Sequence, residues 1–419
     1  MIQQFQIEKF IYLNKWFLNI VGLYPQKSWR FVTSLFCMLL LVIPQFVQIY
    51  LFCTDLSVIL ETSSVLFTIL LAMLKGAVWI FNGKSMEDLV GFLFNEYWKI
   101  IESFDNSKTL VKYAGYYICV YYSYAIYIFC FSWIFHWKDI SGFRYANKMT
   151  KGYTFLIINA LLFFFSLPPI EILILKFNGT YKSSDKHFPF PATYPDFLKE
   201  FPYFQIVYFS QIIATMTCAL VILATDTLIA TALFHTCGQF VVIQQKLELL
   251  SSNDGHETGE MIKRKIILIV KHHQMVIGFS KKMERVFSPM MFLQVFASSM
   301  IICLVGLQVS TTFTNQYKLV KYFSYLLMAL FQLLLFCWPG DQLLLQSGKV
   351  CQSAYFTKWY QFGKERRGEI QLMLLRSQKL IGITAGKFYL MSLENFNVIL
   401  STSMSYFMVL RSFNSSEGK

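Results

Sequence analysis

Formal charge is scarce in this chain. Of its 419 residues only 15% are Asp, Glu, Lys or Arg, whereas 55% are hydrophobic and 18% are aromatic. Soluble domains average about 25% charged residues, and long uncharged stretches of about 20 residues are typical of membrane-spanning helices. The mean hydropathy of +0.47 agrees. The composition therefore excludes an ordinary soluble domain and predicts an all-α, polytopic membrane protein.

The patterns of metal sites and catalytic centres are also missing. The nine cysteines lie mostly inside apolar stretches and show no disulfide or zinc spacing. There is no His-Glu-x-x-His, no Gly-x-Ser-x-Gly, no phosphate-binding loop and no dinucleotide fingerprint. His235, Cys237, His272 and His273 lack the spacing of zinc ligands, so a helix-packing role is favoured. We therefore expect no enzyme, no cofactor and no metal.

The net charge of +13 does not indicate a nucleic-acid partner, because the basic residues lie in loops between apolar stretches. In such loops Lys and Arg orient the chain and contact anionic lipid. Residues 1–29 place three lysines among apolar side chains, which predicts an amphipathic cytoplasmic segment at the membrane surface. No cleavable signal precedes the first span, so we expect that span to be its own insertion signal.

Eight stretches are apolar enough to be considered as spans. They are Phe31–Thr54, Thr62–Asn82, Tyr113–Trp137, Gly152–Ile170, Phe201–Thr225, Val286–Thr312, Tyr322–Gly340 and a C-terminal helix at 392–413. Lys75 lies within the second stretch, and we expect it to snorkel to an interface. Glu171 and Asp226 lie at stretch ends, where a helix-end role is favoured over proton coupling.

The distribution of basic residues tests this count. The first 30 residues carry four Lys or Arg, 227–284 carry seven and 341–387 carry eight, whereas 54–61 carry none. Positive-inside reasoning places the three basic regions in the cytoplasm, so an even number of crossings precedes residue 227. The chain is therefore predicted to have seven transmembrane helices, with the N-terminus cytoplasmic and the C-terminus extracellular.

Only one of two stretches can then be the third span. Tyr113–Trp137 is longer and follows the polar loop directly, whereas Gly152–Ile170 better suits a cytoplasmic basic segment at 138–151. We favour the first and expect the second to be a partly buried extracellular segment. The two glycosylation sequons, at Asn178 and Asn414, both fall outside in this topology.

The C-terminal stretch has an unusual face. Ser392 is placed to cap a helix, with Glu394 in its first turn. At helical spacing Val398, Thr402, Ser405, Val409 and Phe413 share one face, which mixes hydroxyl and apolar groups without charge. Such a face suits a pore lining that water can enter and leave. An ordinary spanning helix with small packing residues is the alternative.

This stretch resembles a known signature. Thr384-Ala-Gly-Lys-Phe, then Ser392-Leu-Glu-Asn-Phe and Ser405-Tyr-Phe-Met-Val-Leu, match in order the C-terminal signature of the insect odorant receptors. The resemblance implies a ligand-gated, non-selective cation channel in the plasma membrane. In that family a tuning subunit forms a heterotetramer with a shared co-receptor, and the last helix lines the pore. Val409 and Phe413 match the narrowing positions, although Phe413 departs from the family's leucine.

The resemblance also implies a division of the chain. Residues 30–228 hold spans one to four with an extracellular loop at 138–200, and residues 229–285 form cytoplasmic helix extensions with a linker. Residues 286–340 hold spans five and six, 341–391 form cytoplasmic anchor helices, 392–413 are the pore helix and 414–419 the outer tail. The anchor would hold four subunits together. A helix is expected from Gly368 to Ile383, and the proline-rich loop near Phe188 is either a connector or a lid.

The resemblance implies a small apolar volatile as ligand and places its pocket in the outer halves of helices two, three, four and six; such a pocket is expected to be lined by aromatic residues with few polar groups. Tyr322 and Tyr325 are three residues apart, share a face and resemble the family's paired pocket tyrosines. From the topology we add Leu66, Leu70, Trp133, Phe204, Tyr208 and Gln211.

Two other functions are weighed. A metabotropic seven-helix receptor needs the opposite orientation, and its Asp-Arg-Tyr and Asn-Pro-x-x-Tyr motifs are absent. A gustatory-type receptor of the same superfamily is nearer, but its final helix ends differently from the Ser-Tyr-Phe at 405–407.

Overall fold

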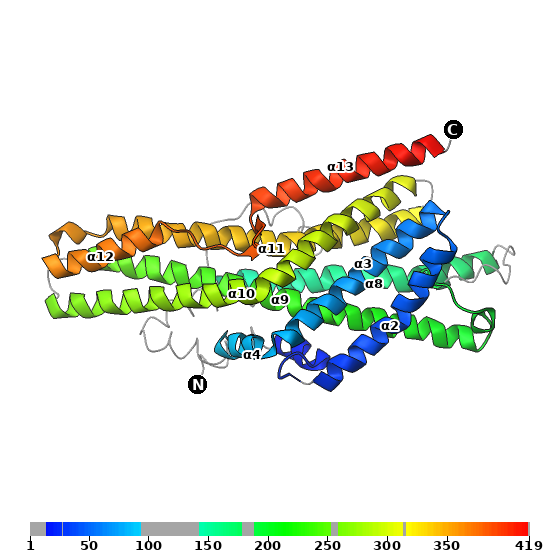
Figure 1. The fold of residues 1–419 in the computed structure, drawn as a ribbon, viewed down its shortest axis with the longest axis horizontal. Helices are drawn as coiled ribbons and strands as arrows, with labels where there is room; N and C mark the ends of the chain where they lie inside the picture. The colour runs from blue at the N-terminus through cyan, green and yellow to red at the C-terminus, as the bar shows by residue number, and fades with distance from the viewer. Residues whose placement is uncertain are drawn as a thin grey trace.

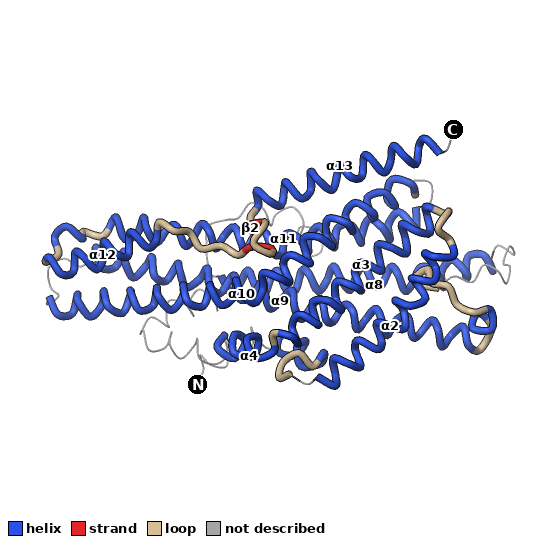
Figure 2. The backbone as a smooth tube through the Cα atoms, in the orientation of Figure 1, coloured by secondary structure: helices blue, strands red, loops and turns tan. Residues whose placement is uncertain are grey.

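The computed structural model describes residues 14–26, 28–93, 142–177, 188–252, 259–312 and 316–417. The described chain is a long bundle of helices with one small hairpin (Figures 1 and 2). The helices are α2 Ser28–Leu51, α3 Leu56–Phe81, α4 Gly83–Gly91, α8 Gly142–Phe177, α9 Tyr203–Ser252, α10 Gly259–Thr311, α11 Gln316–Phe356, α12 Lys364–Ser377 and α13 Leu393–Glu417, with 3₁₀ turns η4 Asp196–Lys199 and η5 Trp359–Gln361.

Within the described residues, six helices are long and apolar enough to cross a membrane: α2, α3, α8, α9, α10 and α11. Each contains one of the predicted apolar stretches or most of it, and α8, α9, α10 and α11 continue well beyond their stretches. The expected seventh crossing, α13, is not among the six, because hydroxyl and amide side chains are spread along it. The predicted all-α membrane class is therefore supported, whereas the count of seven and the orientation stay predictions.

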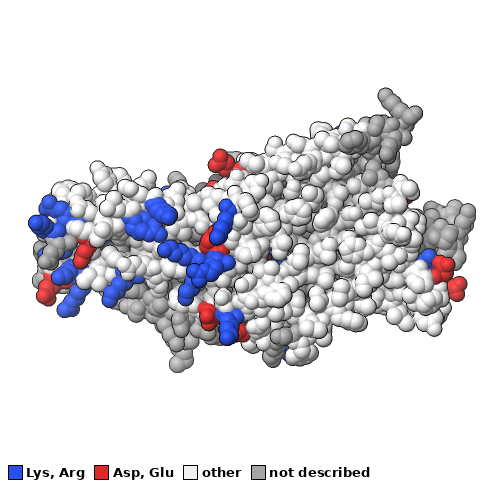
Figure 3. Space-filling model, in the orientation of Figure 1, with Lys and Arg blue, Asp and Glu red and all other residues white. Residues whose placement is uncertain are grey.

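Among the described helices, α9, α10 and α11 are the longest, and each is longer than the thickness of a bilayer. α9 has 50 residues and α10 has 53, which at 1.5 Å per residue give lengths of about 75 and 80 Å. The hydrocarbon core is only about 30 Å thick. The surplus forms one end of the bundle with α11 and α12, and Lys and Arg gather on that end, whereas the rest of the same face is nearly uncharged (Figure 3).

The stretch 152–170 is part of the bundle. It lies within the 36-residue helix α8, which packs against α9 and α11. The expectation of a partly buried extracellular segment there is therefore wrong. Burial of Tyr153, Ile157 and Phe164 against these two helices stabilises its position in the bundle. The competing stretch, Tyr113–Trp137, lies outside the described residues.

Residues 14–21 are helical, and Phe17, Leu18 and Val21 are buried in the core while Trp16 and Ile20 stay exposed. The side chain of Asn14 also donates a hydrogen bond to Thr231 of α9, at 2.7 Å. This part of the predicted amphipathic segment thus packs its apolar face on the protein.

The helix expected from Gly368 to Ile383 ends earlier, at Ser377 of α12. Residues 380–383 are not helical and lead into the hairpin, so the helix does not continue through them. Only part of its apolar surface is covered: Ile370 and Met373 are buried, whereas Leu372 and Leu375 are largely exposed.

The Thr-Ala-Gly-Lys-Phe sequence forms a hairpin of strands β1 Thr384–Ala385 and β2 Tyr389–Leu390. A hydrogen bond from the Phe388 amide to the Ala385 carbonyl closes its turn, and both central residues, Gly386 and Lys387, have positive φ (60° and 67°). Positive φ favours glycine, because a side chain clashes with the backbone there.

The hairpin is fixed to one face of α10. Glu284 accepts hydrogen bonds from the backbone amide (2.8 Å) and the hydroxyl of Thr384, and the Ser288 carbonyl accepts from the Gly386 amide at 3.1 Å. Phe292, one further turn along, lies 5.9 Å from the ring of Phe388. Because residues four apart share a helix face, these three positions form a continuous seat.

α13 starts directly after the hairpin. As predicted, Ser392 caps it: the Ser392 hydroxyl accepts a hydrogen bond from the Asn395 amide at 3.2 Å, and Glu394 lies in the first turn. The entry to the helix touches α11, where a Cβ on Gly340 would clash with the Met391 carbonyl oxygen. The helix packs on α10 and α11 and lies along the edge of the bundle (Figure 1).

Candidate functional site

A cavity of about 70 Å³ lies between α3, α8, α9 and α11. Its lining is mostly apolar, and six of its side chains carry polar groups. The lining residues are Val65, Thr68 and Ile69 of α3; Tyr153, Ile157, Ala160, Leu161 and Phe164 of α8; Phe190; Thr215, Cys218, Ala219 and Ile222 of α9; and Tyr325, Met328 and Gln332 of α11. An apolar cavity with a few placed polar groups is the usual form of a small-molecule site.

One polar group in the lining joins α11 to α3. The Tyr325 hydroxyl lies 2.5 Å from that of Thr68 and donates to the backbone carbonyl of Ser64 at 3.0 Å. The ring of Tyr325 also meets Phe164 edge to face, with centroids 5.7 Å apart. These contacts fix the tyrosine in one orientation at the cavity wall.

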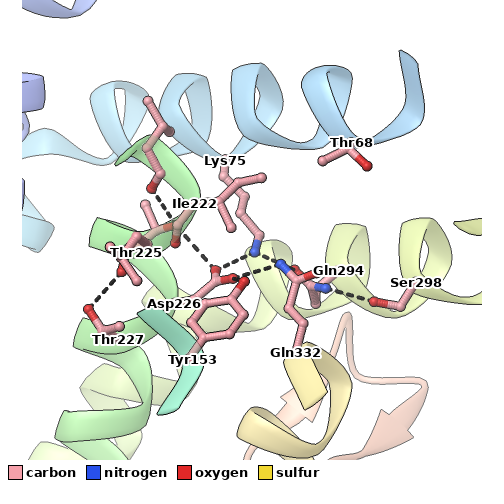
Figure 4. A network of polar contacts seen from close by, with 12 residues as sticks. Thr68, Lys75, Tyr153, Ile222, Thr225, Asp226, Thr227, Gln294, Ser298 and Gln332 are labelled. Carbon is pink, nitrogen blue, oxygen red and sulfur yellow. Dashed lines mark hydrogen bonds and ion pairs between the residues drawn. The ribbon is translucent and has the colours of Figure 1, made fainter. Parts of the chain in front are cut away.

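A second polar group lies at the cavity floor and centres on a buried carboxylate (Figure 4). Asp226 of α9 accepts hydrogen bonds from the Tyr153 hydroxyl (3.0 Å) and the Gln332 amide (2.8 Å), both from cavity-lining residues. It also forms an ion pair of 2.5 Å with Lys75 of α3, and neither side chain is exposed. A buried pair of this kind is sustained only when further hydrogen bonds satisfy its remaining atoms.

The expectation that Lys75 snorkels to an interface is therefore wrong. Its ammonium group is held by Asp226 and by the side-chain oxygen of Gln294 on α10, and it lies 5.3 Å from the ring centre of Phe336. Asp226 likewise is no helix end, since α9 continues to Ser252. A charge in an apolar environment without a partner is too costly to remain, and here the partner comes from 151 residues away.

The proline-rich loop before α9 supplies part of the cavity wall. Phe190, from the proline-rich loop, stacks on Phe164 with centroids 5.1 Å apart. Gln211 of α9 holds the loop: its side chain accepts from the Phe190 amide (3.1 Å) and donates to the Phe190 carbonyl (3.3 Å) and the Tyr194 hydroxyl (3.2 Å). The loop thus covers the cavity rather than only connecting two helices.

The other predicted pocket residues lie around this cavity. Tyr322 is buried but outside the lining, and its hydroxyl bonds to Glu61 of α3, which also pairs with Lys321 at 2.9 Å. Leu66 and Leu70 of α3 pack in the hydrophobic core of the protein and do not line the cavity. The ring of Phe204 stacks on Phe188 at 4.8 Å, and the Tyr208 hydroxyl donates to the Phe165 carbonyl at 2.8 Å. Of the predicted set, Tyr325 lines the cavity directly and Gln211 holds its loop.

The predicted pore face of α13 is exposed in the single chain. Val398, Thr402, Ser405 and Val409 all lie on it, and Val409 is 52% exposed. The opposite face packs on α10, where Ile399 and Ser403 are buried and the Ser403 hydroxyl donates to that of Ser299 at 3.3 Å.

Several predicted residues fall outside this description. Trp133 and Asn178 lie outside the described residues, and for Phe413 and Asn414 only the α13 backbone is described.

Two signals were missed from the sequence. The α8 residues that line the cavity were not predicted, because Tyr113–Trp137 was favoured as the third span over Gly152–Ile170. The ion pair was missed because Lys75 and Asp226 were interpreted separately, although one cation and one anion in separate apolar stretches are a recognisable pairing signal.

Of the histidines, His272 bonds to Gln239 of α9 at 2.8 Å, in keeping with a helix-packing role. The part of the chain that is described holds no group of three potential metal ligands.

The chain is similar to known proteins in sequence and in fold. Odorant receptor 13a of Drosophila melanogaster is 33% identical over 264 residues, covering 59% of this chain and 62% of that protein. Odorant receptor 10 of Aedes albopictus is 24% identical over 211 residues, covering 50% of this chain and 56% of that receptor. These matches thus span under two thirds of either relative.

The solved structure of the insect olfactory receptor OR5 from Machilis hrabei in complex with eugenol superposes with a TM-score of 0.73. At 16% identity, over 98% of this chain and 99% of that one, the likeness concerns the fold. The 7tm odorant receptor model matches residues 143–404, more than half of the sequence. The chain belongs to the 7tm odorant receptor family.

Proposed function

We propose that this chain is the odorant-tuned subunit of a ligand-gated, non-selective cation channel. A small apolar volatile binds in the cavity between α3, α8, α9 and α11, and the channel is a heterotetramer with a co-receptor. The observation that carries the proposal is the cavity itself, an apolar space with few polar groups, in a chain of the odorant receptor family. Burial of ligand area supplies the affinity, at about 25 cal/mol per Å².

In this proposal α8 is the third crossing and α13 the seventh. The support for α8 is its length, its apolar composition and its packing between α9 and α11. The basic end of the bundle, formed by α10, α11 and α12, then lies in the cytoplasm (Figure 3), and the C-terminus lies outside.

Gating follows from the contacts of α13. The helix is held by α10 and α11 on one side and leaves its hydroxyl-rich face uncovered, including Thr402, Ser405 and Val409. Four such faces would line a central pore, with Val409 and Phe413 at its narrow part. The cavity floor reaches α10 through Gln294, which accepts from Gln332 at 3.4 Å and donates to Ser298 at 2.7 Å. The next residue, Ser299, bonds to Ser403 of α13.

Ligand binding shifts this system only by its differential affinity for the open state. We propose that a ligand against Tyr153 and Gln332 moves α8 and α11 relative to α10, and that α13 follows because the hairpin on Glu284 and Ser288 ties its start to the same helix.

The test is an odorant panel on excised membrane patches without nucleotides, from cells expressing the chain with a co-receptor and without one. The channel proposal expects odour-evoked cation current in such patches only when both subunits are present. A metabotropic receptor would lose its response there, because it needs a G protein and nucleotide, and that outcome would reject the proposal.

A further inference from the structure

The cavity has an unusual division of hydrogen-bonding capacity. Six of its lining side chains carry a polar hydrogen, and each of these hydrogens is directed at an acceptor of the protein. These side chains are Thr68, Tyr153, Thr215, Cys218, Tyr325 and Gln332.

At the outer wall, three oxygens share two hydrogens. The hydroxyls of Thr68 and Tyr325 lie 3.2 and 3.0 Å from the Ser64 carbonyl and 2.5 Å from each other. Whichever hydroxyl donates to its neighbour, both hydrogens stay among these three oxygens. A hydroxyl has two acceptor lone pairs, so acceptor capacity remains on both side chains.

At the floor, the donors serve Asp226 and Gln294. The Tyr153 hydroxyl donates to Asp226, and the Gln332 amide donates to Asp226 and to Gln294. Among the described residues, no hydrogen bond is made to the side-chain oxygen of Gln332, and this oxygen is not fully buried. Because Gln332 lines the cavity, a ligand can reach this free acceptor.

On α9, the Thr215 hydroxyl donates to the Gln211 carbonyl at 2.7 Å, and the Cys218 thiol points at the Thr68 carbonyl at 3.8 Å. The backbone amide of Phe190, the lining residue from the loop, is taken by Gln211. The surface of the cavity is almost entirely apolar, and because the hydrogens of its polar side chains are already committed, the small polar part can only accept hydrogen bonds.

From this division we infer that the cavity selects ligands that donate a hydrogen bond, such as alcohols and phenols, over ketones, aldehydes, esters and ethers of the same skeleton. This rests on the proposed function, since it names the ligand class of the same cavity. A ligand hydroxyl bonds to Gln332, Thr68 or Tyr325 without disturbing any existing bond. A ligand that only accepts must draw a hydrogen away from Asp226 or from the Ser64 carbonyl, and buried groups left without a partner are costly.

The experiment uses cells expressing the full chain with a co-receptor, and matched pairs of ligands: hexan-1-ol with hexanal, cyclohexanol with cyclohexanone, and phenol with methoxybenzene. In each pair that activates, the donor is expected to act at a concentration lower by about tenfold or more, given the usual cost of one unsatisfied buried group. Thermal unfolding of the purified chain with each ligand gives a second readout that does not depend on gating.

Thr68→Val removes one acceptor and keeps the shape of the side chain. It is expected to reduce the donor preference at least threefold, by weakening the response to the alcohols, while the carbonyl partners change less than twofold. The matched control is Thr217→Val, also on a helix of the bundle, where the hydroxyl bonds its own backbone at Ile213 and lies outside the lining. It is expected to leave the preference unchanged.

The outcomes are distinguishable. If the panel activates the receptor but the carbonyl or ether partner is equally or more potent, the donor inference is wrong and the proposed function stands. If no ligand evokes current or thermal stabilisation from a chain that reaches the surface, the proposed function fails and the inference fails with it.

Discussion

The ion pair between Lys75 and Asp226 positions several helices of the apolar bundle relative to one another. Its two members and their partners come from five helices, α3, α8, α9, α10 and α11, so one carboxylate and one ammonium group fix the relative positions of all five. Replacing one partner leaves the other charge buried and uncompensated, whereas replacing both need not.

We therefore predict that Lys75→Met lowers the free energy of unfolding by about 3–5 kcal/mol, the usual cost of an unpaired buried charge. The double variant with Asp226→Asn is predicted to recover at least half of that loss, because an amide oxygen still accepts from Tyr153 and Gln332. Thermal unfolding of the purified variants, together with surface levels, measures both. Additive losses in the double variant would contradict a direct pairing.

The same residues mark a limit of sequence reasoning. Composition identified Lys75 as an unusual residue, but the choice between snorkelling and pairing depends on which helices are neighbours, and this contact spans 151 positions. Tyr325 was identified because a family pattern and an i, i+3 spacing pointed to it. Tyr153 and Phe164 were not predicted to line the cavity, because the stretch 152–170 was expected to be a partly buried extracellular segment and not a span.

At the scale of elements, the sequence predicted the start of α13 but not the hairpin that precedes it. The Thr-Ala-Gly-Lys-Phe sequence needs a glycine at 386 for two reasons: φ is 60°, and a Cβ there would lie 2.9 Å from the ring of Phe292. Ser392 then starts α13 as its capping chemistry predicted.

Gly386→Ala is predicted to destabilise the seating of the hairpin by about 1 kcal/mol or more, because alanine at positive φ is strained and meets Phe292. We expect less odour-evoked current per surface receptor, since α13 is then less firmly tied to α10. Current normalised to surface labelling measures this.

Gly368→Ala is the matched control. Gly368 lies inside α12, and a Cβ added there would meet no neighbouring atom within 4 Å, so alanine is expected to leave current unchanged or to add slight helix stability. Equal effects of both variants would contradict a specific role of the turn.

Helix positions were otherwise predictable from uncharged stretches, but their ends were not. α9 and α10 continue through polar residues because their partners beyond the bilayer are one another and α11. α12 ends early because the chain must turn into the hairpin, where a Cβ on Gly382 would lie within 3 Å of both Leu390 and Leu344. Such endings depend on tertiary contacts that no local pattern records.

For the whole molecule, the uncovered face of α13 is the feature that a single chain does not explain. Val409→Glu is predicted to change the relative permeability of monovalent and divalent cations, and Val409→Ala to leave a standing current without odorant, because both alter the narrow part of the proposed pore. Whole-cell recordings with the co-receptor measure both. Currents indistinguishable from the parent would remove Val409 from the gate.

Orientation is a second question at this scale. An epitope appended after Lys419 is predicted to be labelled in intact cells, because the basic end of the bundle is assigned to the cytoplasm and seven crossings separate the termini. An epitope in the 253–258 linker, between α9 and α10, is expected to need permeabilisation. The reverse pattern would invert the layout.

The cavity wall consists of two kinds of residue, and this bears on how such receptors diversify. Two polar members, Tyr153 and Gln332, bond to the carboxylate that joins five helices, so a change at either of them endangers the fold as well as the ligand site. The apolar members, such as Ala160, Ala219 and Met328, have side chains that form no hydrogen bonds, so they do not join helices in this way. Exchanging them changes the shape of the cavity by single methyl groups, and each such change alters the discrimination between ligands by about 1–3 kcal/mol. Substitutions at these positions can therefore change the preferred ligand in small steps without loss of the fold.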